Sequence, residues 1–216
     1  MKYQAIIFDW DGTLSNSTGR IVESLQLASR DAQLEELSEF ELKQIIGLGL
    51  PEALRQLWPQ LAGDVAAIDD MQKLYAKHYI SEMRSSISFF EYAGSMLDNL
   101  LKADLDLAVA TGKSRVGLNR AFKELKAGHW FRASRCADET KSKPHPLMLN
   151  ELAASLSVAP ENMLMVGDTT FDLEMANAAG IDAVAITHGA HHLDKLMGCH
   201  PVHVVHNLRQ LNDWLM

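Results

Sequence analysis

The chain has 216 residues, a formal net charge of −8 and a hydrophobic fraction of 47%. A chain of this length buries about 70% of its surface on folding, so we expect one domain, or one domain with a small insert, and exclude a disordered chain. The acidic balance disfavours nucleic acid as a partner, because like charges repel at long range. Cys136 and Cys199 are too few for a disulfide framework or a four-thiolate zinc site, so both are expected to be free thiols.

The N-terminal residues are interpreted as part of the folded protein. Asp9 and Asp11 interrupt the first apolar run, whereas a signal peptide needs an uninterrupted one. No stretch approaches the roughly 20 apolar residues that span a membrane. We therefore expect a soluble, cytoplasmic protein that does not associate with membranes.

Short apolar segments, most of them followed by polar or glycine residues, alternate with helical patterns along most of the chain. The expected strands are residues 3–8, 105–110, 162–166, 183–186 and 202–205. The expected helices are residues 95–102, 115–125, 146–156 and 171–179. Strands alternating with helices of this length predict an α/β fold with a doubly wound parallel sheet.

One region breaks this alternation. From residue 18 to residue 84 the apolar spacing is helical, and prolines and glycines divide it into about four helices. We expect residues 16–85 to form a helical cap domain inserted into an α/β core made of residues 1–15 and 86–216.

Polar residues follow the expected strands at the edge where parallel sheets bind ligands. They are Asp9, Asp11 and Gly12 after the first strand, Thr111 and Gly112 after the second, Lys143 before a helix, and Asp168 and Asp172 after a later strand. Carboxylates suit Mg²⁺, whereas a lysine, a hydroxyl and backbone N–H groups suit phosphoryl oxygens. This combination is typical of a magnesium site that handles phosphate.

Four motifs in this set resemble those of the haloacid dehalogenase superfamily. They are FDWDGTL at residues 8–14, Thr111 after an apolar strand, Lys143 in KPHP, and GDTTFD at residues 167–172. All four occur in order, and the resemblance covers essentially the whole chain, including the inserted cap. Within the superfamily the sequence is most similar to the small capped phosphatases of the phosphoglycolate phosphatase-like group.

The resemblance implies a role for each residue of the first motif. Asp9 would be the nucleophile that forms an aspartyl-phosphate, and it would also bind Mg²⁺. Asp11 would act as general acid and then as general base, and its backbone carbonyl would bind the metal. Gly12 would let the chain turn close beside the phosphate, because it has no Cβ.

The remaining motifs supply charge and hydrogen bonds. Thr111 and the N–H of Gly112 would hold phosphoryl oxygens, and Lys143 would neutralise negative charge there. Asp168 would bind Mg²⁺ directly, whereas Asp172 would orient a metal-bound water or Lys143.

Several neighbouring residues are expected to have no catalytic role. Lys141 and Lys113 are interpreted as solvated loop lysines. The histidines near the C-terminus are interpreted as surface or loop residues rather than a zinc site: His188, His191, His192, His200, His203 and His206.

The function predicted from these residues is a Mg²⁺-dependent phosphatase acting on a small phosphorylated metabolite. A β-phosphoglucomutase-like phosphomutase and a pyrophosphatase remain open, because both fit the same motifs. A phospho-receiver or a binding module is a non-enzymatic alternative, although receivers lack the first motif and the inserted cap. A dehalogenase is disfavoured because those enzymes lack an acid at the position of Asp11. The loop at residues 46–52 is expected to help select the substrate, whose identity and the oligomeric state stay open.

Overall fold

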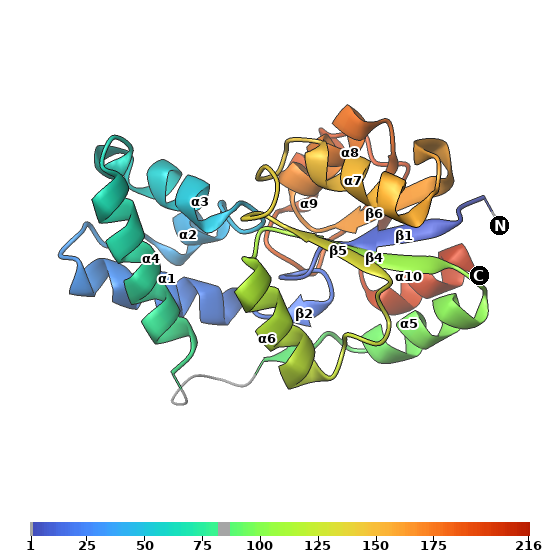
Figure 1. The fold of residues 1–216 in the computed structure, drawn as a ribbon, viewed down its shortest axis with the longest axis horizontal. Helices are drawn as coiled ribbons and strands as arrows, with labels where there is room; N and C mark the ends of the chain where they lie inside the picture. Colours follow the sequence, from blue (N-terminus) through green and yellow to red (C-terminus); the bar gives the residue numbers. More distant parts are fainter. Residues whose placement is uncertain (1, 82–86) are drawn as a thin grey trace.

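The computed structural model describes residues 2–81 and 87–216. Within them, parallel strands form a six-stranded sheet in the order β5-β4-β1-β6-β7-β8 (Figure 1). Their bounds are β1 Ala5–Phe8, β4 Asp106–Thr111, β5 Ala133–Cys136, β6 Met163–Gly167, β7 Asp182–Ile186 and β8 His203–Val205. The expected doubly wound α/β fold is confirmed.

Strand β1 lies at the centre of the sheet because both of its faces are apolar and buried. In the register of the sheet, Phe8 lies between Val109 of β4 and Val166 of β6. The residues that follow these three strands therefore meet at one edge of the sheet.

Helices cover both faces of the sheet (Figure 1). On one face, side chains such as Ile6 pack with α5 Ala93–Lys102, α6 Arg115–Leu125 and α10 Leu208–Leu215. On the other face, side chains such as Ile7 pack with α7 Leu147–Leu156, α8 Thr170–Ala179 and α9 Leu193–Met197. Alternate β1 residues thus serve two separate cores, as the two-residue period of a strand requires.

A group of helices lies beside the carboxyl edge of the sheet (Figure 1). It comprises α1 Thr18–Asp31, α2 Glu39–Lys43, α3 Leu50–Leu57, a short 3₁₀ helix Pro59–Leu61 and α4 Val65–Tyr79. We call residues 18–79 the helical insert. Its helices pack around a core of their own, which includes Leu25, Leu54 and Trp58. The expectation of about four helices is confirmed for the described part of residues 18–84.

Two short segments connect the helical insert to the sheet region. Strands β2 Ser15–Asn16 and β3 Ser88–Phe89 pair antiparallel. The boundary expected near residues 85–88 falls partly outside the described residues, so the division into core and cap stays a prediction. In the described part of the chain, no helix is both long enough and apolar enough to cross a membrane.

The structure adds elements that the sequence pattern did not indicate. Strand β5 was not expected, because it is a sheet edge whose Ser134 and Arg135 are polar and only half-buried. Strands β2 and β3, and helices α9 and α10, were also not expected. The five expected strands are all present, with ends shifted by one or two residues.

Candidate active site

Asp9 follows β1 directly and is almost completely buried, with 1% of its surface exposed. Its Oδ1 accepts a hydrogen bond of 2.5 Å from Lys143 Nζ. Its Oδ2 is buried and has no hydrogen-bond partner among the described residues. Burial raises the pKa of the Asp9 carboxyl well above its usual range, Lys143 opposes that rise, and the neighbouring acids Asp172 and Asp168 add to it.

Lys143 comes from the loop between β5 and α7, and its side chain is completely buried. Its ammonium lies between two carboxylates, donating to Asp9 Oδ1 and, at 2.6 Å, to Asp172 Oδ1. Burial alone would lower the pKa of Lys143, but the charges of Asp172 and Asp9 raise it above its ordinary value. The side chain is therefore a fixed positive charge, whereas Lys141 is exposed, as expected.

Asp168 follows β6, the neighbour of β1, and is completely buried. Its Oδ1 accepts a hydrogen bond from Thr13 Oγ1 at 2.6 Å, and its Oδ2 accepts one from the Ala190 N–H at 2.7 Å. Burial and the charge of Asp172 raise the pKa of Asp168 to about 7, although these hydrogen bonds oppose the rise.

Asp172 lies in the first turn of α8 and has two functions in the structure. Its Oδ2 accepts hydrogen bonds from the N–H of Thr169 at 3.1 Å and from Thr169 Oγ1 at 2.7 Å, so the two residues form a capping box. Its Oδ1 accepts from Lys143. The helix cap therefore fixes the carboxylate that holds the lysine.

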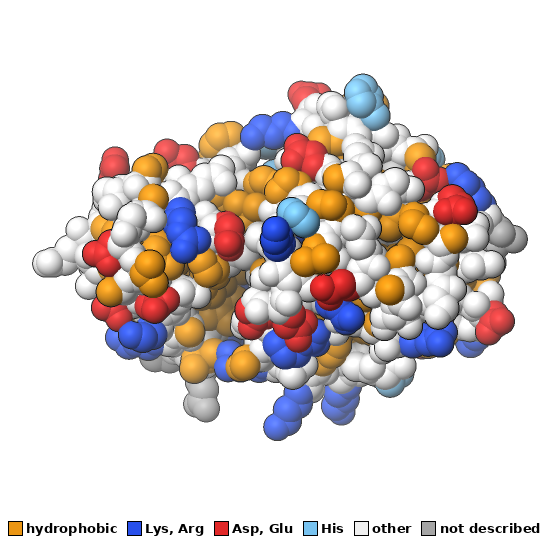
Figure 2. Space-filling view, turned by 45° about the horizontal axis from the view of Figure 1, so that its top comes forward, with side chains coloured by type: hydrophobic (Ala, Val, Ile, Leu, Met, Phe, Trp, Pro, Cys, Tyr) orange, Lys and Arg blue, Asp and Glu red, His pale blue; other side chains and the backbone are white. Residues whose placement is uncertain are grey.

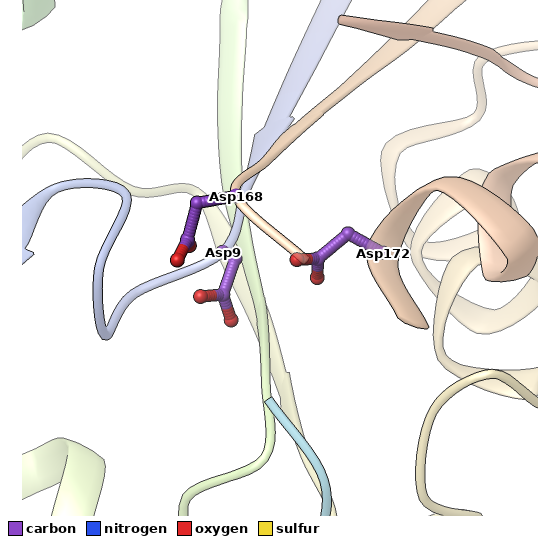
Figure 3. Close-up of side chains that lie close together, drawn as sticks. All are labelled: Asp9, Asp168 and Asp172. Carbon is purple, nitrogen blue, oxygen red and sulfur yellow. The ribbon is translucent and has the colours of Figure 1, made fainter. Parts of the chain in front are cut away.

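The three carboxylates Asp9, Asp168 and Asp172 converge (Figure 3). One oxygen from each lies within 4.8 Å of the other two, and all three residues are buried. Lys143 is the positive charge in contact with this group, and Asp9 Oδ2 has no partner within the described chain. A cluster with more carboxylates than cations and with one unpaired oxygen fits a divalent cation such as Mg²⁺.

The carboxylate of Asp11 is held by partners other than those of the cluster. Its Oδ1 accepts from Ser17 Oγ at 2.5 Å and pairs with Lys113 Nζ at 3.0 Å. Lys113 also donates to the Tyr79 hydroxyl at 3.1 Å. The expectation that Lys113 is solvated was wrong, because its side chain is only 9% exposed and joins Asp11 to the helical insert.

The residues expected to hold phosphate also lie at this edge. Thr111 ends β4 and is buried, and its Oγ1 accepts from the Lys113 N–H at 3.2 Å. A Cβ added at Gly112 would lie 2.3 Å from the carbonyl oxygen of Leu48, so the backbone of the helical insert approaches very closely there. Gly12 has a φ of +91°, and an added Cβ would lie 2.3 Å from Asp168 Oδ2.

The sequence did not assign roles to several residues that orient the site. Thr13 and Thr169 hold Asp168 and Asp172, and both lie inside motifs, so their position could have indicated them. Ser17 and Tyr79 contact Asp11 and Lys113, and nothing in the local sequence marks them.

Two of the histidines expected at surface or loop positions make specific contacts. His191 is buried, and its Nδ1 accepts from the Thr170 N–H at 3.0 Å while its Nε2 lies 3.2 Å from the Gln44 carbonyl oxygen of the insert. His188 stacks on Phe90 with ring centroids 3.8 Å apart. Both are in loops, as expected, and neither belongs to the carboxylate cluster among the described residues. His192, His200 and His206 are exposed, and His203 is half-buried.

A cavity of about 410 Å³ extends from Asp9 and Asp11 to the helical insert. Residues 46–52, expected as a loop but containing the start of α3, line it together with residues of α1, α4 and α6. In Figure 2 the surface is hollowed between the helical insert and the sheet region, and hydrophobic side chains gather in the hollow. A ligand bound there would touch both the acidic residues after β1 and the insert.

The fold and the carboxylate cluster agree with what comparison with known proteins shows. The family model described as haloacid dehalogenase-like hydrolase matches residues 6–186. The chain therefore belongs to the haloacid dehalogenase-like hydrolase family, which confirms the resemblance seen in the four motifs and the expectation of an enzyme.

Individual relatives cover most of the chain. Phosphoglycolate phosphatase from Salmonella typhi is 26% identical over 206 residues, which are 86% of this chain and 82% of that protein. Pyrophosphatase PpaX from Oceanobacillus iheyensis is 23% identical over 212 residues, 98% of this chain and 96% of that protein. The crystal structure of a hydrolase from Pseudomonas syringae matches with a TM-score of 0.89 at 21% identity, covering 98% of this chain and 97% of that chain, which shows a shared fold.

Proposed function

We propose that this protein is a Mg²⁺-dependent phosphatase that hydrolyses a small phosphate monoester through an aspartyl-phosphate. The observation that carries the proposal is the buried convergence of Asp9, Lys143, Asp168 and Asp172, with Asp9 Oδ2 left without a partner in the described structure. The Asp9 carboxylate is held in place through Oδ1 by Lys143, and Oδ2 is the oxygen without a partner among the described residues.

Asp9 and Asp168 would hold the metal, together with the backbone carbonyl of Asp11. Asp172 belongs to the same cluster, and its contact with Lys143 favours a supporting role for it. When bound, Mg²⁺ would neutralise the carboxylates and the phosphoryl oxygens, so that two anions can approach each other.

The covalent chemistry would take place in two displacements at phosphorus. In the first, an oxygen of Asp9 forms a bond to phosphorus, the ester P–O bond breaks, and protonated Asp11 gives its proton to the leaving oxygen. In the second, Asp11 takes a proton from water, the water oxygen attacks phosphorus, and the bond to Asp9 breaks. The products are an alcohol and inorganic phosphate, with Asp9 again a carboxylate and Asp11 again protonated.

Other residues would stabilise the charge that develops on the phosphoryl oxygens. Thr111 and the N–H of Gly112 are suited to donate hydrogen bonds, because Thr111 ends the strand next to β1 and Gly112 follows it. Lys143, a permanent cation beside Asp9, would offset negative charge throughout the cycle.

We further propose that residues 16–85, which include the helical insert, form a cap over a core made of residues 1–15 and 86–216. The close approach of Leu48 to Gly112 and the Lys113–Tyr79 contact support a closed arrangement over Asp11. Such closure would exclude water while the first displacement takes place.

Pyrophosphate is a second candidate substrate, favoured by similarity to the pyrophosphatase from Oceanobacillus iheyensis. It would use the same displacement at phosphorus, with phosphate in place of an alcohol as the leaving group. The largely apolar cavity next to Asp11 favours an organic leaving group instead.

The proposal is tested by measuring phosphate release from a panel of esters and pyrophosphate, with Mg²⁺ and with a chelator. Metal-dependent hydrolysis is expected, and Asp9→Asn should abolish it, because an amide is a far weaker nucleophile. Activity retained by Asp9→Asn would remove Asp9 as the nucleophile. Absence of turnover on every compound would refute the proposed phosphatase function.

A further inference from the structure

The wall of the cavity beside Asp11 is mainly apolar. Ile21 and Leu25 of α1, Ile46 of the loop, and Tyr75 and Tyr79 of α4 line it. The two tyrosine rings lie side by side, with centroids 5.5 Å apart and planes tilted by 31°. Such a wall favours apolar and ring-shaped groups, because it offers them burial and aromatic contacts.

Acidic side chains outnumber cationic ones among the described residues that line the cavity. Among the described lining residues the cations are Lys113 and Arg120, and Lys113 is already paired with Asp11 at 3.0 Å. Arg120 is exposed, and the acidic side chains of Glu52 and Asp138 also line the cavity. A carboxylate bound beside Asp9 and Asp11 would lose water and meet like charges, while Lys113 is already paired with Asp11, so its binding there is unfavourable.

The volume of the cavity gives the third constraint. About 410 Å³ lies within the range of sites that bind ring-sized organic ligands, and it exceeds what a two-carbon acid fills. Because Asp9 and Asp11 both line this space, a phosphoryl group at Asp9 would place the leaving alcohol inside it.

We propose that the substrate is a phosphate monoester whose alcohol part is uncharged, largely apolar and ring-bearing, and that the α1 and α4 side chains of the helical insert select it. This proposal rests on the proposed phosphatase function and specifies its substrate class. The proposed substrate differs from phosphoglycolate, for which one relative is named, because the leaving group of phosphoglycolate carries a carboxylate.

The first test compares benzyl phosphate with 2-phosphoglycolate, two esters of primary alcohols that differ in a phenyl ring against a carboxylate. We expect kcat/KM to be at least about tenfold higher for benzyl phosphate, since a single methylene in an apolar pocket already changes kcat/KM by about tenfold or more. Equal or higher kcat/KM for 2-phosphoglycolate would overturn the proposed substrate class without contradicting the proposed phosphatase function.

Variants locate the selection in the cavity. Tyr75→Ala should raise KM for benzyl phosphate by about tenfold or more, whereas Tyr75→Phe should keep it near the wild-type value. Ala76→Lys adds an ammonium to the cavity wall and should shift the preference toward 2-phosphoglycolate. Val65→Ala, at an exposed position of α4 outside the cavity, is the matched control and should leave KM unchanged for both substrates. A KM for benzyl phosphate that does not respond to Tyr75→Ala would contradict the assignment.

A binding measurement separates the substrate class from catalysis. Benzylphosphonate and phosphonoacetate resist hydrolysis and present the same contrast between ring and carboxylate. We expect calorimetry with Mg²⁺ to show benzylphosphonate binding at least about tenfold more tightly. Tighter benzylphosphonate binding without turnover of any ester would uphold the cavity assignment and refute the phosphatase. Tighter phosphonoacetate binding would refute the cavity assignment.

Discussion

Replacing Asp168 by asparagine should change how the stability of the metal-free protein depends on pH. The pKa of this buried carboxyl rises from 3.8 to about 7 on folding. A group with a raised carboxyl pKa holds its proton more tightly in the folded state, so it favours folding at low pH. That contribution is lost as the pH rises toward 7.

The size of the effect follows from the same shift. One pKa unit corresponds to about 1.4 kcal/mol, so the full shift corresponds to on the order of 4 kcal/mol. Between pH 5 and pH 8 the wild-type protein should lose about 2 to 3 kcal/mol of unfolding free energy through this carboxyl. Asp168→Asn should not lose it, because an amide does not ionise. The altered hydrogen bonds to Thr13 and Ala190 change the unfolding free energy by a similar amount at both pH values, so they cancel in the comparison.

The assay is urea unfolding of both proteins with a chelator present, at pH 5 and at pH 8. The stability of Asp168→Asn relative to wild type should increase by about 2 to 3 kcal/mol from pH 5 to pH 8. Asp70→Asn, at an exposed acid, is the control and should show little change with pH. An unchanged difference for Asp168→Asn at the two pH values would refute the argument that burial destabilises this carboxylate.

The remaining predictions concern the lysine, the approach of the insert and the thiols. Lys143→Met should lower kcat by about 10²–10³-fold, because it removes the fixed charge beside the reacting groups, whereas Lys141→Met should leave kcat unchanged. Equal kcat values for the two variants would contradict the role of Lys143. Gly112→Ala should raise KM and cost about 1 to 3 kcal/mol in urea unfolding, because its methyl group would overlap the backbone of the insert, whereas Gly19→Ala meets nothing within 4 Å and should be tolerated. Iodoacetamide should label the half-buried Cys199 in the folded protein, and the buried Cys136 only after denaturation, as measured by peptide mass spectrometry. Labelling of Cys136 before Cys199 would contradict the burial pattern.

The sheet could be predicted because its central strands are continuous apolar runs. Residues 5–8, 106–111 and 163–167 are buried on both faces, so their sequences carry a strong signal. Strand β5 is an edge strand, and its polar residues give no such signal. The order of strands then explains why residues far apart in sequence meet at one edge.

The candidate site could be predicted where a motif contains the functional residue, and not where a distant contact decides its environment. The convergence of Asp9, Lys143 and Asp168 agrees with the motifs, although their catalytic roles stay predictions. Lys113 was expected to be solvated, because its partner Asp11 is about a hundred residues away and Tyr79 lies in the insert. Burial of His191 likewise depends on a contact with the insert that no local pattern reveals.

The central claim is that Asp9 becomes phosphorylated during turnover. The most direct test uses Asp11→Asn with acetyl phosphate, whose leaving group needs no general acid, so that attack on the substrate proceeds while attack by water is slowed. After acid quench, mass spectrometry should find one phosphoryl group on the peptide that contains Asp9, and none in the variant that also carries Asp9→Asn. Phosphate release by the double variant above the rate of acetyl phosphate alone, or a phosphoryl group found on another residue, would contradict the account.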